Sequence, residues 1–114
     1  MPELLPALTD IFKKSKNTNN WRWRIEHAQH VNITDIPKFA ELRIIPSMQS
    51  VHCTSDAIFV PTRLGKLRAA QEAYAWRKFI EAGSTIINGT DAPVEDVAPI
   101  QNFHSAVTRK ISGT

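Results

Sequence analysis

The stretch Trp21-Arg22-Trp23-Arg24-Ile25-Glu26-His27 decides how this chain of 114 residues is expected to fold. Its apolar side chains stand at every second position with basic side chains between them, which is the pattern of a β-strand. We expect this strand over residues 22–26, ending at His27. Because imidazole nitrogen is a common metal ligand, the same stretch also indicates where a functional site could lie.

Two further β-prone stretches end near a side chain that can bind a metal ion. Residues 44–49 precede His52, and residues 85–88 lead directly into Asp91. His27 and His52 are 25 residues apart, about one strand–helix–strand step. The 39 residues from His52 to Asp91 correspond to one long step or two compressed ones.

Segments with helical periodicity lie around these strands, and we expect helices over residues 3–14, about 35–42, 66–82 and 99–110. In the longest of them Ala69, Ala73, Trp76 and Ile80 share one face, and Gly83 stands where a glycine commonly ends a helix. The alternation of strands and helices predicts an α/β protein with parallel strands.

The remaining segments are less regular. The helix of residues 99–110 is expected to be amphipathic, with Ile100, Phe103 and Val107 as its apolar face. Pro46 removes one backbone donor from the strand at residues 44–49. Residues 53–65 show neither the period of a strand nor that of a helix, so we expect a long loop there. Such loops often cross the mouth of a functional site.

The composition is that of an ordinary globular protein, with 42% hydrophobic and 22% charged residues. A net charge of +3 is too small to require a polyanionic partner, so we expect neither nucleic acid nor membrane binding. The single cysteine, Cys53, excludes an internal disulfide and fits a reducing compartment, and the start of the chain lacks the pattern of a signal peptide. We therefore expect a cytoplasmic protein.

A hydrolytic metal site needs neutral imidazoles and carboxylates, together with an open position for water. His27, His52 and Asp91 supply these ligand types. The spacing alone does not decide the question, because a histidine is more often a surface or core residue than a ligand. The alternation of tryptophan and arginine over residues 21–24 has an alternative reading as a platform for single-stranded nucleic acid, which we rank lower.

Six collinear motifs strengthen the metal hypothesis. They are Arg24-Ile25-Glu26-His27-Ala28-Gln29, Phe39-Ala40-Glu41-Leu42, Ser47-Met48-Gln49, Arg63-Leu64-Gly65, Ala73-Tyr74-Ala75-Trp76-Arg77 and Gly89-Thr90-Asp91-Ala92-Pro93-Val94-Glu95. In order and spacing the chain resembles the family-3 amidohydrolases over about residues 22–110. The resemblance implies a partial (β/α)8 TIM-type barrel, roughly the units of strands five to eight, with outer helices.

In that resemblance His27 matches the ligand that ends strand five, His52 the ligand after strand six, and Asp91 the aspartate of strand eight. Asp91 would be both a metal ligand and the catalytic residue that shuttles a proton. The implied reaction is hydrolysis of a non-peptide carbon–nitrogen bond in a small amide-type substrate by a metal-bound hydroxide, with zinc as the expected cation.

The chain departs from the family pattern because it has no His-x-His pair and no matching strand-four ligand. We therefore expect residues 21–114 to be an incomplete barrel domain, preceded by a helix and linker at residues 1–20, and to be inactive alone, with little or no metal bound. The alternatives are a non-catalytic interaction module, which would self-associate through exposed strand edges, and a truncated relic.

Tyr74 and Arg77 are weaker candidates for substrate binding, since an arginine can contact a substrate carboxylate with two hydrogen bonds. Their other reading is that both simply cover a helix face.

Overall fold

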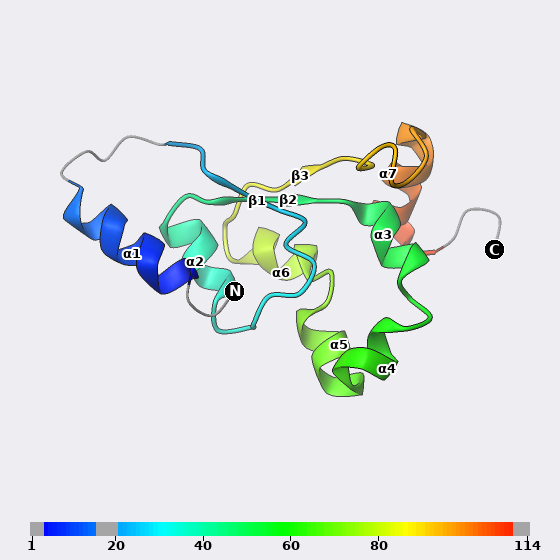
Figure 1. Cartoon of the computed structure of the whole chain (residues 1–114), viewed down its shortest axis with the longest axis horizontal. Helices are drawn as coiled ribbons and strands as arrows, with labels where there is room; N and C mark the ends of the chain where they lie inside the picture. Colours follow the sequence, from blue (N-terminus) through cyan, green and yellow to red (C-terminus); the bar gives the residue numbers. More distant parts are fainter. Residues whose placement is uncertain (1–3, 16–20, 111–114) are drawn as a thin grey trace.

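The computed structural model describes residues 4–15 and 21–110. The helices and strands follow one another along the chain (Figure 1) as α1 (Leu4–Lys14), β1 (Arg24–Glu26), α2 (Ile36–Glu41), β2 (Ile45–Met48), α3 (Ser50–Ser55), α4 (Val60–Leu64), α5 (Lys66–Glu72), α6 (Trp76–Glu81), β3 (Ile87–Asn88) and α7 (Pro99–Thr108). The predicted linker at residues 16–20 lies outside the described residues.

The strands form one parallel sheet in the order β1-β2-β3. Arg24 of β1 is opposite Ile45 of β2, and Ser47 of β2 is opposite Ile87 of β3. The prediction of three parallel strands in one sheet is thus confirmed. Because β2 and β3 are direct neighbours, the segment between them is one long crossover. The described residues therefore contain three strands, whereas units five to eight of a barrel would contain four.

Pro46 is tolerated inside the central strand because its nitrogen, which carries no hydrogen, does not face a paired part of a neighbouring strand. Successive residues of a strand direct their backbone groups toward opposite neighbours, and the Ile45 N–H donates to the Trp23 carbonyl at 2.8 Å on the β1 side. The backbone nitrogen of Pro46 therefore points to the β3 side of the strand. The pairing of β2 with β3 begins only at Ser47, so no hydrogen bond is lost there.

One face of the sheet carries the hydrophobic core. Ile25 and Met48 point into it, and the rings of Phe39 on α2 and Phe79 on α6 meet edge to face, 4.9 Å between centroids, with both side chains fully buried. Figure 1 shows α2 and α6 on this side of the strands, whereas α3 and α7 lie beyond the carboxyl ends of the strands. On the other face of the sheet Arg24 pairs with Glu26 at 2.9 Å, and both side chains are more than half exposed.

The prediction of a loop over residues 53–65 is wrong, since most of this segment is helical in α3 and α4. Pro61 occupies the first turn of α4, where its missing N–H costs nothing, and Val60 is buried against the core. Both helices are too short to show a periodic pattern, so helical periodicity does not indicate them.

The single helix predicted over residues 66–82 is also wrong, because it breaks between α5 and α6. There the backbone pairs with another segment: Tyr74 N–H donates to the Gln29 carbonyl at 2.7 Å, and Val31 N–H donates to the Glu72 carbonyl at 3.2 Å. Tyr74 has a φ of 50°, in the left-handed region. The break turns Phe79 into the core and leaves Ile80 52% exposed, so the predicted apolar face does not pack as a unit.

Helix α7 packs its polar face on the protein, although its amphipathic pattern predicts that the apolar face would be buried. Ile100, Phe103 and Val107 are 80%, 67% and 68% exposed, whereas Asn102 and Ser105 are buried. The polar face packs on α3. Its role there is to supply hydrogen bonds, as described below.

Helix α1 was predicted correctly, and its Leu5 is buried in the same hydrophobic cluster as the strands and α6. The molecule is elongated, 50 × 30 × 24 Å, with a radius of gyration of 15.0 Å. A compact domain of this length has a radius of gyration of about 13 Å. Among the described residues, no helix has the length and apolar character needed to cross a membrane.

Candidate metal centre

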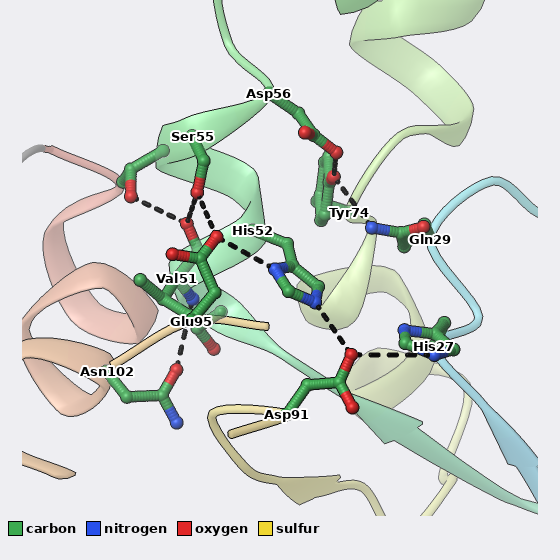
Figure 2. A network of polar contacts seen from close by, with 12 residues as sticks. His27, Gln29, Val51, His52, Ser55, Asp56, Tyr74, Asp91, Glu95 and Asn102 are labelled. Carbon is green, nitrogen blue, oxygen red and sulfur yellow. Dashed lines mark hydrogen bonds and ion pairs between the residues drawn. The ribbon is translucent and has the colours of Figure 1, made fainter. Parts of the chain in front are cut away.

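Three side chains from separate parts of the chain converge at the carboxyl edge of the sheet (Figure 2). His27 directly follows β1, His52 lies in the first turn of α3 after β2, and Asp91 follows β3. Each offers one ligand atom, and these three atoms all lie within 4.8 Å of one another. The three residues that the family resemblance implies as ligands therefore lie together in space.

The separations of the donor atoms have the size expected around one small cation. Asp91 Oδ2 is 3.4 Å from His52 Nε2 and 3.9 Å from His27 Nε2. Bonds of about 2.0–2.1 Å in a tetrahedral arrangement hold two donor atoms about 3.3 Å apart. The imidazole rings of His27 and His52 are nearly parallel, with centroids 5.9 Å apart and 18° between their planes. Both observed distances exceed the usual length of an N–H···O hydrogen bond.

Two of the three residues have a left-handed backbone conformation. The φ angle is 67° at His27 and 60° at Asp91. For residues other than glycine this conformation costs on the order of 1–3 kcal/mol, and it concentrates at functional sites. Here it turns the chain sharply at the strand ends, so that both side chains face His52 (Figure 2).

Sequence reasoning missed Glu95 as a functional residue, although it stands four residues after Asp91 in a quoted motif. Glu95 Oε1 lies 3.0 Å from His52 Nδ1 and also accepts a short hydrogen bond from the Ser55 hydroxyl. The Ser55 hydroxyl, followed by His52, holds the pKa of the Glu95 carboxyl below its usual value, while partial burial opposes this shift. The sequence carries no periodic signal for such a contact, because residues 52 and 95 are far apart in the chain.

The first turn of α3 is held by two asparagines. Asn88 Oδ1 accepts a hydrogen bond from the Ser50 N–H, and Asn102 Oδ1 accepts one from the Val51 N–H, both at 3.0 Å. These two N–H groups have no partner within a helix that is just beginning. The contacts fix the start of α3 and with it the position of His52.

Neither of the two weaker candidates, Tyr74 and Arg77, belongs to the group of three converging side chains. Tyr74 is buried, its hydroxyl donates to Asp56, and Gln29 Nε2 donates to it at 3.0 Å. Burial, followed by the hydrogen bond to Asp56, raises the pKa of Tyr74 far above its usual value. Arg77 is exposed and pairs with Glu81 at 2.7 Å. A contact of either residue with a substrate stays a prediction.

Cys53 lies on α3 next to His52 but belongs to the hydrophobic cluster. Burial raises the pKa of its thiol, with Arg109 opposing the shift, so the reactive thiolate is disfavoured. Cys53 also lines a cavity of about 550 Å³ together with Val60, Ala69 and Arg109. None of the three candidate ligands lines this cavity.

Known proteins resemble this chain in sequence. It is 36% identical over 88 residues to the protein LONG AFTER FAR-RED 3 of Arabidopsis thaliana, covering 77% of this chain and 15% of that protein. It is 38% identical over 103 residues to YtcJ of Bacillus subtilis (strain 168), which is named as an amidohydrolase, covering 90% of this chain and 19% of that one. The chain thus spans less than a fifth of these relatives.

Two solved structures share the fold, both described as uncharacterized metal-dependent hydrolases. The one from Pyrococcus furiosus has a TM-score of 0.72 and 26% identity, covering 91% of this chain and 21% of that chain. The one from Pyrococcus horikoshii OT3 has a TM-score of 0.74 and 27% identity, covering 93% and 20%. A family model described as "Amidohydrolase family" matches residues 3–114. The chain therefore belongs to the amidohydrolase family.

Proposed function

We propose that this chain supplies one part of the active site of a metal-dependent amidohydrolase, with His27, His52 and Asp91 as ligands of a divalent cation. The observation that carries the proposal is the pair of separations from Asp91 Oδ2 to the two Nε2 atoms, 3.4 Å and 3.9 Å. They are long for hydrogen bonds and close to the edges of a metal coordination shell.

The donor set fits zinc, which binds imidazole nitrogen and carboxylate oxygen and keeps an open position at catalytic sites. When bound, such a cation supplies Lewis acidity, lowering the pKa of water and polarising a carbonyl group. The side chains of His27 and Asp91 are 45% and 35% exposed, so this side of the site is accessible to further ligands and a substrate, whereas that of His52 is only 9% exposed. In this proposal Asp91 also accepts and returns a proton.

The remaining ligands lie outside these 114 residues in this proposal, in the rest of a (β/α)8 barrel. The exposed Arg24–Glu26 pair on β1 supports this arrangement, because an inner barrel face is enclosed only when all strands are present. The parent enzyme would hydrolyse carbon–nitrogen bonds of small amide-type substrates in the cytoplasm. The chain alone would bind zinc weakly and lack catalytic activity.

Metal titration tests the ligand assignment. We expect zinc to bind the chain weakly, and His52→Ala and Asp91→Ala each to reduce the affinity at least about 10-fold, because each removes one of three donors. His104→Ala is the matched control, since His104 lies on α7 and contacts Thr108. Equal affinities in the wild type and the two ligand variants would refute the assignment. Hydrolysis of acyl-amide substrates by the chain alone, lost on chelation, would contradict the expected inactivity.

One observation favours the second candidate, an interaction module. Five apolar side chains are more than 65% exposed over one continuous segment of loop and helix, and they are Val94, Val97, Ile100, Phe103 and Val107. We call them the α7 apolar surface. Exposed apolar patches of this kind commonly mark protein–protein contacts.

A further inference from the structure

We propose that Glu95 is a positioning residue for the metal centre, which keeps the His52 proton on Nδ1 and leaves the Nε2 lone pair directed at the ligand position beside Asp91. The inference rests on the proposed function for its consequence, since an oriented Nε2 matters only if a cation binds there. The tautomer itself can be measured without a metal.

The geometry decides which ring nitrogen carries the proton. An ionised carboxylate only accepts hydrogen bonds, so a neutral ring can donate to Glu95 or to Asp91 but not to both. Nδ1 is 3.0 Å from Glu95 Oε1, within the range of a hydrogen bond, whereas Nε2 is 3.4 Å from Asp91 Oδ2, which is too long for a good one. The proton therefore belongs on Nδ1, and Nε2 is free to bind a cation.

Glu95 is itself held in place from the helix that carries His52. The Ser55 hydroxyl, one helical turn after His52, donates to the same Oε1 atom that faces Nδ1. The hydroxyl also lies 3.0 Å from the Val51 carbonyl, but a carboxylate is the stronger acceptor of its single proton. Ser55, Glu95 and His52 thus form one connected unit (Figure 2).

The two histidines of the site differ in this respect. The side chains of His52 and Glu95 are 9% and 24% exposed, so water competes little for their hydrogen bond. His27 is 45% exposed, and within the described part of the chain no carboxylate other than Asp91 contacts its ring nitrogens. His52 is therefore the ligand whose orientation is fixed in advance, and His27 the one that adjusts when a cation binds.

Metal-binding histidines generally donate their second ring N–H to a carboxylate or carbonyl, and loss of that partner reduces metal affinity about 10–100-fold. We expect Glu95→Leu to lower the zinc affinity within this range. Glu95→Gln should keep most of the affinity, because its amide oxygen still accepts from Nδ1. Ser55→Ala should have a smaller effect than Glu95→Leu. Asp96→Asn, a neighbouring exposed carboxylate, is the matched control.

The experiment combines nitrogen NMR of the imidazole rings in the metal-free chain with zinc titration of the same samples. The expected result is the Nδ1–H tautomer of His52 in the wild type, Glu95→Gln and Asp96→Asn, and a mixture of tautomers in Glu95→Leu. A wild-type ring protonated on Nε2, or an unchanged tautomer in Glu95→Leu, would overturn the inference.

The two proposals fail in different ways. If the wild type binds no zinc while Glu95→Leu changes the tautomer, the metal assignment fails and the orienting contact stands. If His52→Ala abolishes zinc binding while Glu95→Leu binds as the wild type does, the positioning role alone fails. Should Glu95→Leu lose its fold by circular dichroism, Ser55→Ala provides the same test through the loss of one hydrogen bond to Oε1.

Discussion

Val51 donates its backbone N–H to the side-chain oxygen of Asn102, 51 residues further along the chain, across 3.0 Å. This hydrogen bond joins the beginning of α3 to the buried polar face of α7. Asn102 is buried at this contact, while the apolar side chains of α7 face the solvent. A backbone N–H left without a partner costs about 1–3 kcal/mol, so the hydrogen bond favours packing the polar face of α7 on α3.

Replacing Asn102 by leucine should destabilise the protein by about 1–2 kcal/mol, the usual effect of losing a helix-capping side chain. Leucine has nearly the same size but leaves the Val51 N–H without its acceptor. Urea unfolding followed by circular dichroism measures the change. The control is Gln101→Leu on the exposed side of the same helix. Equal free energies of unfolding for the two variants would show that the hydrogen bond to Val51 does not stabilise the protein.

Truncating Phe39 should reduce the stability strongly, whereas truncating Phe103 should have little effect. Phe39 is fully buried against Phe79, so Phe39→Ala should cost about 3–5 kcal/mol through lost burial and the cavity left behind. Phe103 is 67% exposed on α7, and at concentrations where the chain is monomeric Phe103→Ala should change the stability by less than about 0.5 kcal/mol. Thermal or urea unfolding compares them. A large loss in Phe103→Ala would mean that the α7 apolar surface is covered in solution.

Stability should fall at alkaline pH because of Tyr74, whose ordinary pKa is 10.0 and whose pKa in the fold is raised. Below pH 10 the phenol is protonated in both the folded and the unfolded chain, and the stabilisation is fully present. Above pH 10 the unfolded chain releases the proton while the folded chain retains it, which favours unfolding. The stability advantage of the wild type over Tyr74→Phe should therefore shrink as the pH rises from 10.

The same group can be observed directly, because Tyr74 is the only tyrosine in the chain. Its phenolate absorbance should not appear near pH 10 but only at higher pH or together with unfolding. Appearance of the phenolate near pH 10 in the folded protein would contradict the raised pKa.

Gly83 should be sensitive to substitution, since its φ of 90° lies where side chains are strained. It ends α6, with its N–H donating to the Ile80 carbonyl at 2.9 Å. Gly83→Ala should cost about 1–2 kcal/mol. Gly89→Ala is the control, because its φ is not positive and an added Cβ would meet nothing within 4 Å. Urea unfolding should show a loss only for the first variant.

The α7 apolar surface should drive association of this chain with a second copy. Sedimentation velocity at increasing concentration should show dimers or larger species for the wild type, and mostly monomer for Ile100→Lys combined with Phe103→Lys. Leu67→Lys is the control, because Leu67 is 70% exposed on α5, away from this surface. A wild-type chain that stays monomeric at all concentrations would contradict the expectation.

The sequence determined the parallel strands and the three residues that converge at their ends. Alternation around Ile25, the apolar run before Asn88 and the placement of a ligand candidate after each strand are local patterns, and they follow from the period of two of a β-strand. Parallel strands bring their carboxyl ends to one edge, and the resemblance to the amidohydrolases singled out His27, His52 and Asp91 as the candidate ligands that meet there.

Only the tertiary structure decided the break between α5 and α6, the orientation of α7 and the contact of Glu95 with His52. Each depends on hydrogen bonds between residues that are distant in sequence: Tyr74 with Gln29, Val51 with Asn102, and Ser55 with Glu95. Helical periodicity cannot register such bonds, because it describes which side chains share a face and not which backbone groups still need a partner. These hydrogen bonds therefore became visible only in the folded chain.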